Sequence, residues 1–163
     1  MPKECLLHIY NAFILPCLNY CIIIWGNANT TYINPILILQ KSAIRLICGA
    51  SRLSHCAPLA KQCNLLFVKD LHTVCVLQFM YKVFHKCIAF NDNLFCISGN
   101  ICSRSTRNSK LNFYVFPVST ALRKDCIVHA GVMMWNNLSS DVKLLAYRKF
   151  VFSIRDMIFS NYS

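Results

Sequence analysis

Apolar positions recur at helical spacing along most of the chain, and short polar stretches separate them. Near the N-terminus this spacing is shown by Leu6, Ile9, Phe13, Ile14 and Leu18. It predicts a helix that is buried in a core. Pro16 lies within this stretch, and proline lacks a backbone N–H and crowds the preceding turn, so we expect a kink or a break there.

Two more helices are expected in the following forty residues. Thr30 and Thr31 can cap a helix that carries Pro35 in its first turns. Gly49 is expected to end that helix, because glycine readily adopts the left-handed conformation of a C-terminal cap. A short helix is expected after Pro58.

A longer helix is predicted from about residue 68 to residue 90, with Asn91 at its end. Residues 91–110 are rich in Asn and Ser, which is typical of a loop or linker. Residues 111–118 alternate loosely between apolar and polar side chains and are predicted to be extended.

The chain ends in another helical pattern, which starts near Ser139 or Ser140. We therefore predict a mainly α fold, a helical bundle with a polar loop and a short extended segment before a C-terminal helical part. The expected domains are a helical region at 1–90, a linker at 91–118 and a C-terminal region at 119–163. No internal repeat is found.

The N-terminal stretch is unusual because no charged residue occurs between Glu4 and Lys41. A membrane span at residues 6–25 would have a suitable length. It would also place four polar or helix-breaking side chains in hydrocarbon, namely His8, Asn11, Pro16 and Asn19. The stretch lacks the small-residue cleavage site of a signal peptide. We therefore expect a buried helix at this position, in an intracellular protein of the nucleus or cytoplasm. Membrane association stays an alternative, ranked below the two functional hypotheses given at the end of this section.

Charge is sparse but strongly asymmetric, with 17 Lys and Arg against 6 Asp and Glu and a net charge of +11. Residues 1–40 are neutral and residues 125–163 carry a net +1. Residues 41–124 contain twelve bases and two acids and hold nearly all the excess. This distribution favours an anionic partner, with nucleic acid first and a membrane surface next.

Eleven cysteines raise the possibility of a disulfide scaffold or a metal site. Their odd number and the high apolar content (56%) argue against a small secreted scaffold. No pair has the C-x-x-C spacing of a zinc knuckle, and the nearest groupings are Cys17 with Cys21, His72 with Cys75, and His55 with Cys56 and Cys63. We expect buried thiols in a reducing compartment and no bound metal.

Two segments carry a family resemblance. The run YNAFILPCLNYCIIIWG at residues 10–26, followed by LQKSAIRLI at 39–47, resembles the region just after the polymerase domain in non-LTR retrotransposon reverse transcriptases of the LINE-type, jockey-like group. Further matches in the same order are His55, Pro58, Asp70-Leu71, the FMYK of residues 79–82, Thr106-Arg107, Gly131, the WNNL of residues 135–138, and Phe150. The motif positions expected to be structural are Tyr10, Pro16, Tyr20, Trp25, Gly26, Gln40, Gly131, Trp135 and Asn136.

Three positions depart from the family's pattern. Cys102 stands where a His tends to precede the Thr-Arg pair, and Ser139 stands where a Pro tends to follow the Trp-Asn motif. A proline usual after the long middle helix is missing at residues 91–94. These departures and the cysteine load resemble drift in a decaying copy of the element.

The resemblance implies a larger protein with an endonuclease and a right-hand polymerase, whose three aspartates hold two magnesium ions for phosphoryl transfer. This chain has no adjacent acids, and its closest pair in sequence is Asp141 and Asp156. It also lacks the G-x-S-x-G, P-loop and G-x-G-x-x-G motifs. We expect the catalytic aspartates and their Mg²⁺ to precede Met1, so that the chain has no catalytic residues, cofactor or small-molecule substrate of its own.

The resemblance places the chain at the thumb and beyond, where the expected role is to hold RNA or DNA by its backbone. The candidate bases are Lys41, Arg45, Arg52, Lys82, Lys86, Arg104, Arg107 and Lys110. The first three are spaced to lie on one side of a helix and its exit, the next two are four apart, and the rest lie in the polar loop. Arg107, on the Thr-Arg pair, could equally bond nearby carbonyls. Trp25 and Trp135 are expected in the core.

A second hypothesis assigns the chain a structural role. In this hypothesis the apolar helices of residues 5–50 pack against the upstream palm domain of the intact element protein. Both roles are compatible within one enzyme.

Overall fold

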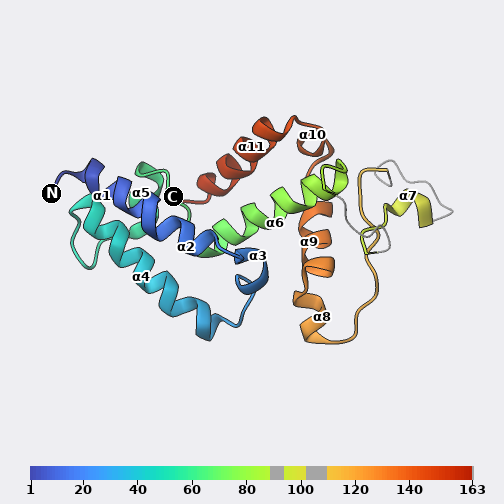
Figure 1. The fold of residues 1–163 in the computed structure, drawn as a ribbon, viewed down its shortest axis with the longest axis horizontal. Coiled ribbons are helices and arrows are strands. Elements are labelled where there is room, and N and C mark those ends of the chain that lie inside the picture. Colours follow the sequence, from blue (N-terminus) through green and yellow to red (C-terminus); the bar gives the residue numbers. More distant parts are fainter. Residues whose placement is uncertain (89–93, 102–109, 163) are drawn as a thin grey trace. The chain divides into compact units, whose positions relative to one another are not determined.

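The computed structural model describes residues 1–88, 94–101 and 110–162 of the chain. Over these residues the fold is mainly helical and contains no strand, which confirms the predicted fold class (Figure 1). In the segment predicted to be extended, Phe113 forms an isolated antiparallel bridge with Ile97.

Most of the described residues belong to helical elements. In chain order they are α1 (Lys3–Ile9), the π-helix η1 (Tyr10–Ile14), α2 (Leu15–Asn19), α3 (Ile22–Trp25), α4 (Thr30–Cys48), α5 (Cys56–Gln62), α6 (Val68–Phe84), α7 (Ser98–Ile101), α8 (Ala121–Asp125), α9 (Ile127–Asn136), α10 (Ser140–Lys143) and α11 (Tyr147–Ser160).

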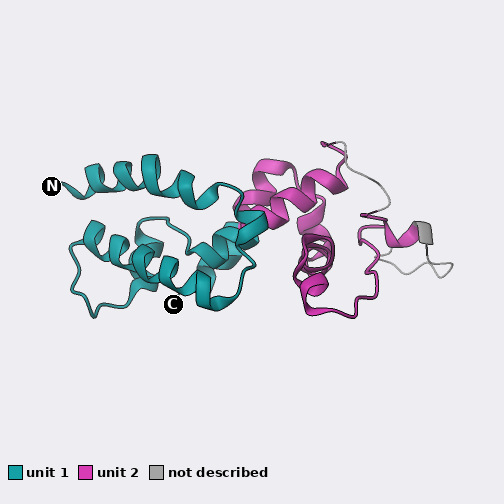
Figure 2. Ribbon diagram, turned by 60° about the horizontal axis from the view of Figure 1, so that its bottom comes forward, with its two compact units in different colours: residues 1–73, 155–163 teal, residues 74–154 magenta. Residues whose placement is uncertain are grey.

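The chain divides into two compact units (Figure 2). Unit 1 comprises residues 1–73 and 155–163, and unit 2 comprises residues 74–154. Helices α6 and α11 each have residues in both units. The division of the chain into domains at 1–90, 91–118 and 119–163 stays a prediction.

Helical structure continues through Pro16 by widening the turn before it. The backbone N–H of Leu15 donates to the carbonyl of Tyr10, five residues earlier, which closes a π-turn. Pro16 cannot donate to the preceding turn, so an irregular turn at this point avoids the break that a regular helix would suffer. The expected distortion is therefore local.

The expected burial of this first helical segment is wrong. Tyr10 is buried with 1% of its surface exposed, whereas Phe13 is 69% and Ile14 is 38% exposed. Apolar periodicity predicts a helix with an apolar face, but it does not identify what covers that face. Among the described residues, no helix combines the length and apolar character that a membrane crossing requires.

The N-cap of helix α4 lies one residue before the predicted threonines, and the helix ends where predicted. The Asn29 side-chain oxygen accepts a hydrogen bond from the backbone N–H of Thr31 at 3.1 Å, so Asn29 and neither threonine is the N-cap. Gly49 has φ of +61° and ends the helix, and the backbone N–H of Ala50 donates to the carbonyl of Arg45. This is the hydrogen-bond pattern of a Schellman C-cap.

Helix α6 is shorter than predicted, because Lys86 adopts the left-handed conformation with φ of +54°. The backbone N–H groups of Lys86 and Cys87 donate to the carbonyls of Val83 and Lys82, which is again a Schellman pattern. Asn91 is therefore not the end of this helix. A lysine in place of the usual glycine gave no signal for the stop in the sequence.

Two smaller corrections concern helix boundaries. Helix α5 starts at Cys56, two residues before the expected start at Pro58. The C-terminal helical part is divided into α10 and α11, with residues 144–146 between them. Its predicted start near Ser139 or Ser140 is confirmed by α10.

A buried glutamine joins three segments of unit 1. The Gln40 side-chain nitrogen donates to the Tyr10 hydroxyl and to the carbonyl of Leu66, both at 2.9 Å. Its side-chain oxygen accepts from the backbone N–H of Val68, the first residue of α6, at 2.9 Å. Gln40 is 3% exposed. One amide from α4 thus satisfies polar groups of η1 and of the chain entering α6.

The C-terminal residues of unit 1 contact the chain around the start of α6. The Tyr162 hydroxyl accepts from the backbone N–H of Phe67 at 2.9 Å and donates to the Asp70 carboxylate. Burial raises the pKa of Tyr162, and the hydrogen bond to Asp70 raises it further. The Arg155 guanidinium donates to the carbonyl of Asn64 at 3.1 Å.

The core of unit 2 is aromatic. Trp135 is fully buried, as expected, and its ring centroid lies 5.1 Å from that of Phe84 and 6.0 Å from those of Phe113 and Phe150. The Tyr81 ring also belongs to the cluster, with its centroid 6.4 Å from that of Trp135 in an edge-on arrangement. Such ring pairs add to the stabilisation that burial alone provides.

The Gln40 network gives a stability prediction. Replacing Gln40 with Ala leaves the Tyr10 hydroxyl, the Leu66 carbonyl and the Val68 N–H without their partner, so we expect a loss of roughly 3 kcal/mol in the free energy of unfolding. Urea unfolding followed by circular dichroism measures it.

Gln62→Ala is the matched control, because Gln62 is an exposed glutamine on α5 of the same unit. It should change the free energy of unfolding by less than about 0.5 kcal/mol. Equal effects of the two substitutions would contradict the role assigned to Gln40.

Candidate nucleic-acid interface

Helix α4 and its exit carry three of the candidate bases in unit 1. Lys41 is partly exposed and places Nζ 5.7 Å from the centroid of the Phe67 ring. Arg45 is also partly exposed, and its Nε donates to the carbonyl of Ser54 at 3.0 Å. Arg52 is exposed on the loop that follows Gly49. Lys41 and Arg45 thus share a helix, and each already makes a contact within the protein.

Two candidate bases lie at the end of α6 in unit 2. Lys82 is exposed, with Nζ 5.7 Å from the centroid of the Tyr147 ring. Lys86 is exposed but follows the helix, because α6 ends at Phe84. These two lysines, four apart in sequence, therefore do not share one helix, although both side chains are exposed.

The remaining candidates lie within residues 91–110, the segment that the sequence predicts to be a polar loop. Lys110 is exposed at the start of the last described segment. Arg104 and Arg107 lie outside the residues that the structure describes. The structure therefore places five of the six described candidates in two groups, one on α4 and its exit in unit 1 and one at the end of α6 in unit 2.

One base is buried, which sequence reasoning missed. Lys143 is 1% exposed, and its Nζ donates to the Asn112 side-chain oxygen at 2.8 Å and to the carbonyl of Asn136 at 3.3 Å. The same nitrogen lies 5.9 Å from the Trp135 ring centroid. Burial lowers the pKa of Lys143. The Lys143 ammonium group therefore makes hydrogen bonds within unit 2 and is not exposed for contact with a partner.

The Trp-Asn motif holds the segment at residues 111–113. The Trp135 indole N–H donates to the carbonyl of Leu111 at 3.0 Å. The Asn136 side chain accepts from the backbone N–H of Phe113 at 3.0 Å and donates to its carbonyl at 2.8 Å. Asn136 therefore pairs with both polar groups of one residue, as a neighbouring strand would do.

Glycines of the motif lie at close helix contacts. A Cβ on Gly131 of α9 would come within 3.1 Å of Met80 Sδ and of Ile127 Cγ1. A Cβ on Gly26 would come within 2.5 Å of the His72 ring. The absence of a side chain at Gly26 thus makes room for a buried imidazole.

Other N-terminal motif residues are more exposed. The Trp25 indole N–H donates to the carbonyl of Tyr20 at 2.7 Å, and Trp25 is only partly buried. Tyr20 is 77% exposed, and Pro16 is also exposed. Trp25 therefore contacts the chain turn between α2 and α3 and is not a fully buried core residue.

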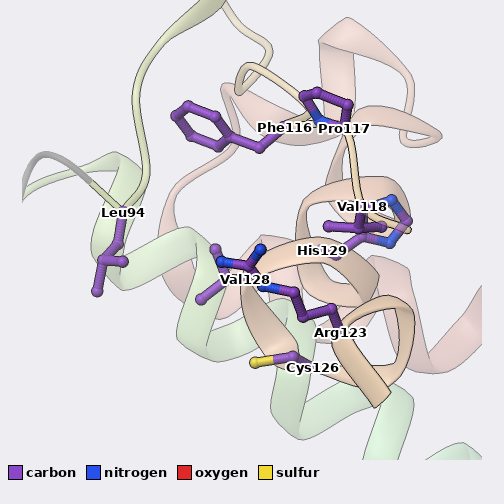
Figure 3. Close-up of a pocket in the computed structure, with 8 residues that line it drawn as sticks. All are labelled: Leu94, Phe116, Pro117, Val118, Arg123, Cys126, Val128 and His129. Atoms are coloured by element: carbon purple, nitrogen blue, oxygen red, sulfur yellow. The ribbon is translucent and has the colours of Figure 1, made fainter. Parts of the chain in front are cut away.

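Within the described ranges, no group of three or more His, Cys, Asp or Glu side chains is placed to hold a metal ion. A cavity of about 500 Å³ lies in unit 2 (Figure 3). Phe116 and Pro117 line one side of it, and Val128 and His129 of α9 line the other. None of the six candidate bases that the structure describes lines this cavity.

Comparison of the chain with family models, with curated proteins and with solved structures gives no match.

His72 gives a pH-dependent prediction. Burial lowers its pKa from the ordinary 6.5, and a hydrogen bond with the backbone of Ile23 partly offsets this. Below pH 6.5 the unfolded chain takes up a proton that the folded chain does not. The contribution of neutral His72 to the free energy of unfolding is therefore fully present above pH 6.5. It should be lost as the pH falls towards the pKa of His72 in the folded chain, by up to about 1.4 kcal/mol per pH unit.

Urea unfolding between pH 7.5 and pH 5 measures this slope. The His72→Gln variant should lose the His72 contribution to it, whatever its stability at pH 7.5. His8→Gln, which changes an exposed histidine of α1 in the same unit, should keep the wild-type slope. Parallel curves for wild type and His72→Gln would exclude His72 as the source.

Proposed function

We propose that this chain is the C-terminal, post-polymerase part of the RNA-directed DNA polymerase of a non-LTR retrotransposon of the LINE-type, jockey-like group. In this proposal it holds the backbone of template and primer without reading sequence, and it has no catalytic activity alone. The observation that carries the proposal is that several motif residues make buried contacts within each unit, whereas several of the candidate bases expose their side chains.

Several motif residues that carry the resemblance make contacts that hold the fold together. Tyr10 and Gln40 are bonded to each other in the core of unit 1. Trp135 and Asn136 bond successive parts of the same segment in unit 2. These contacts support a role for these four motif residues in holding the fold.

The exposed bases suit contact with phosphates. Arg52, Lys82, Lys86 and Lys110 all expose their side chains. Lysine and arginine neutralise phosphates of any sequence and release condensed counterions, so such contacts supply affinity and position without specificity. A helical fold that exposes bases of this kind suits the thumb of a right-hand polymerase, which holds the duplex behind the active site.

Chemistry belongs elsewhere in this proposal. The catalytic aspartates and their two Mg²⁺ ions would be held by an upstream palm domain, and this chain would have no small-molecule substrate. The proposed location is inside the cell, in the nucleus or cytoplasm, where the element's RNA and target DNA are found.

Binding should depend steeply on salt. If about four to six bases meet phosphates of a single strand, the logarithm of the association constant should fall with the logarithm of salt concentration at a slope of roughly −3 to −4. Fluorescence anisotropy with labelled single-stranded RNA and DNA of several sequences measures this slope. A flat salt response, or no binding at low salt, would contradict the proposal.

Charge reversal distinguishes a specific surface from net charge alone. We expect the double variant Lys82→Glu with Lys86→Glu to weaken binding equally for all sequences and to reduce the slope by about one to two units. The matched control reverses two exposed bases of α8 in the same unit, Arg123→Glu with Lys124→Glu. Equal losses in both variants would indicate binding through overall charge only.

The alternative function, packing against a palm domain, also has an observation in its favour. Unit 1 exposes large apolar side chains on its first helices and on α4, including Phe13 at 69%, Ile24 at 81%, Leu39 at 71% and Leu46 at 69%. Exposed apolar surface of this kind is typical of an interaction site or an aggregation-prone face.

Co-expression tests this alternative. The chain alone should aggregate, as measured by light scattering, and should become monodisperse when it is produced with the upstream polymerase domain. Phe13→Ser with Leu46→Ser should reduce aggregation of the isolated chain. A monodisperse wild-type chain would argue against packing as its main role.

A further inference from the structure

Two cysteines of unit 1 lie in direct contact. Cys48 is the last residue of α4, and Cys63 directly follows α5. Their Sγ atoms are 3.4 Å apart. Both residues belong to the same unit, and neither forms a disulfide.

The neighbouring thiol of Cys56 has a different hydrogen-bond partner. Cys56, at the start of α5, is buried and donates to the carbonyl of Lys41 at 3.6 Å. Cys56 is therefore bonded to the backbone, whereas the closest polar neighbour of Cys48 Sγ is Cys63 Sγ. The pair, and not the three thiols together, is poised for reaction.

We propose that Cys48 and Cys63 form a dithiol modification site that a small disulfide of the glutathione class oxidises to an intramolecular disulfide. Cys48 is the more exposed of the two, so its thiolate attacks one sulfur of the oxidant and releases one glutathione thiolate. The Cys63 thiolate then attacks Cys48 Sγ and releases the second. The two protein thiols lose two electrons, and their protons end on two molecules of reduced glutathione.

The required movement is small. A disulfide has sulfurs about 2.05 Å apart, so the two atoms need to approach by somewhat more than 1 Å. The bond would close a ring from residue 48 to residue 63. This ring contains Arg52 and also Ser54, whose carbonyl accepts from Arg45. Oxidation would thus fix the exit of α4, independently of any nucleic-acid function.

The surroundings of Cys48 set the speed of the first step. Burial raises the pKa of Cys48, and the neighbouring Cys63 and Cys56 raise it further, whereas Lys3 lowers it. Little thiolate is present at neutral pH, and the thiolate is the attacking form. The test is therefore best run at pH 8.5.

The experiment treats the full chain with oxidised glutathione at pH 8.5, alkylates the remaining thiols with iodoacetamide, and maps peptides by mass spectrometry. We expect one linked pair of peptides that contains Cys48 and Cys63, with two hydrogens lost and no glutathione attached. The thermal midpoint of the oxidised chain should rise by roughly 5 °C, because the cross-link restricts the unfolded chain.

Matched variants complete the test. Cys63→Ser should leave glutathione attached to Cys48 and abolish the rise in the thermal midpoint. Cys87→Ser, which alters an exposed cysteine of unit 2, should change neither result. Because the linkage is read in the wild-type chain, a poorly folded variant does not remove the test. Alkylation of both thiols, a stable glutathione adduct on wild-type Cys48, or a link from Cys48 to Cys56 would overturn the proposal.

Discussion

The hydrogen bonds of the Gln40 side chain are the constraint on which the rest of unit 1 depends. An amide is suited to this position because it donates to Tyr10 and Leu66 and accepts from Val68 at the same time. Val68 is the first residue of α6, so its hydrogen bond to the Gln40 side-chain oxygen also fixes where this helix starts. Neither an apolar side chain nor a carboxylate could satisfy this mixture of donors and acceptors.

Unit 2 uses the same device with a second amide. Asn136 pairs with both backbone groups of Phe113, and Lys143 bonds the neighbouring Asn112. In both units, polar side chains inside the core set the path of irregular chain, while bases at the ends of helices reach solvent. This division explains how a strongly apolar sequence can form a specific fold and keep charge available for a partner.

The sequence predicted the parts of the fold that depend on local pattern. Helical periodicity and Gly49 identified α4 and its end, and Trp135 was correctly expected in the core. Three features depended on contacts that no local pattern records: the left-handed Lys86 that ends α6, the exposure of Phe13, and the burial of Lys143. The candidate interface was predicted as a list of bases, but the structure was needed to separate solvent-exposed bases from those already engaged.

We propose that this chain is the segment that follows a retrotransposon polymerase domain. The nucleotide sequence upstream of the Met1 codon tests it most directly. We expect this DNA to encode, in an open or a decayed frame, a polymerase that contains the aromatic-x-Asp-Asp tetrapeptide and ends shortly before the Tyr10 motif. Upstream DNA with no trace of polymerase coding, or with an unrelated domain in the same open frame, would contradict it.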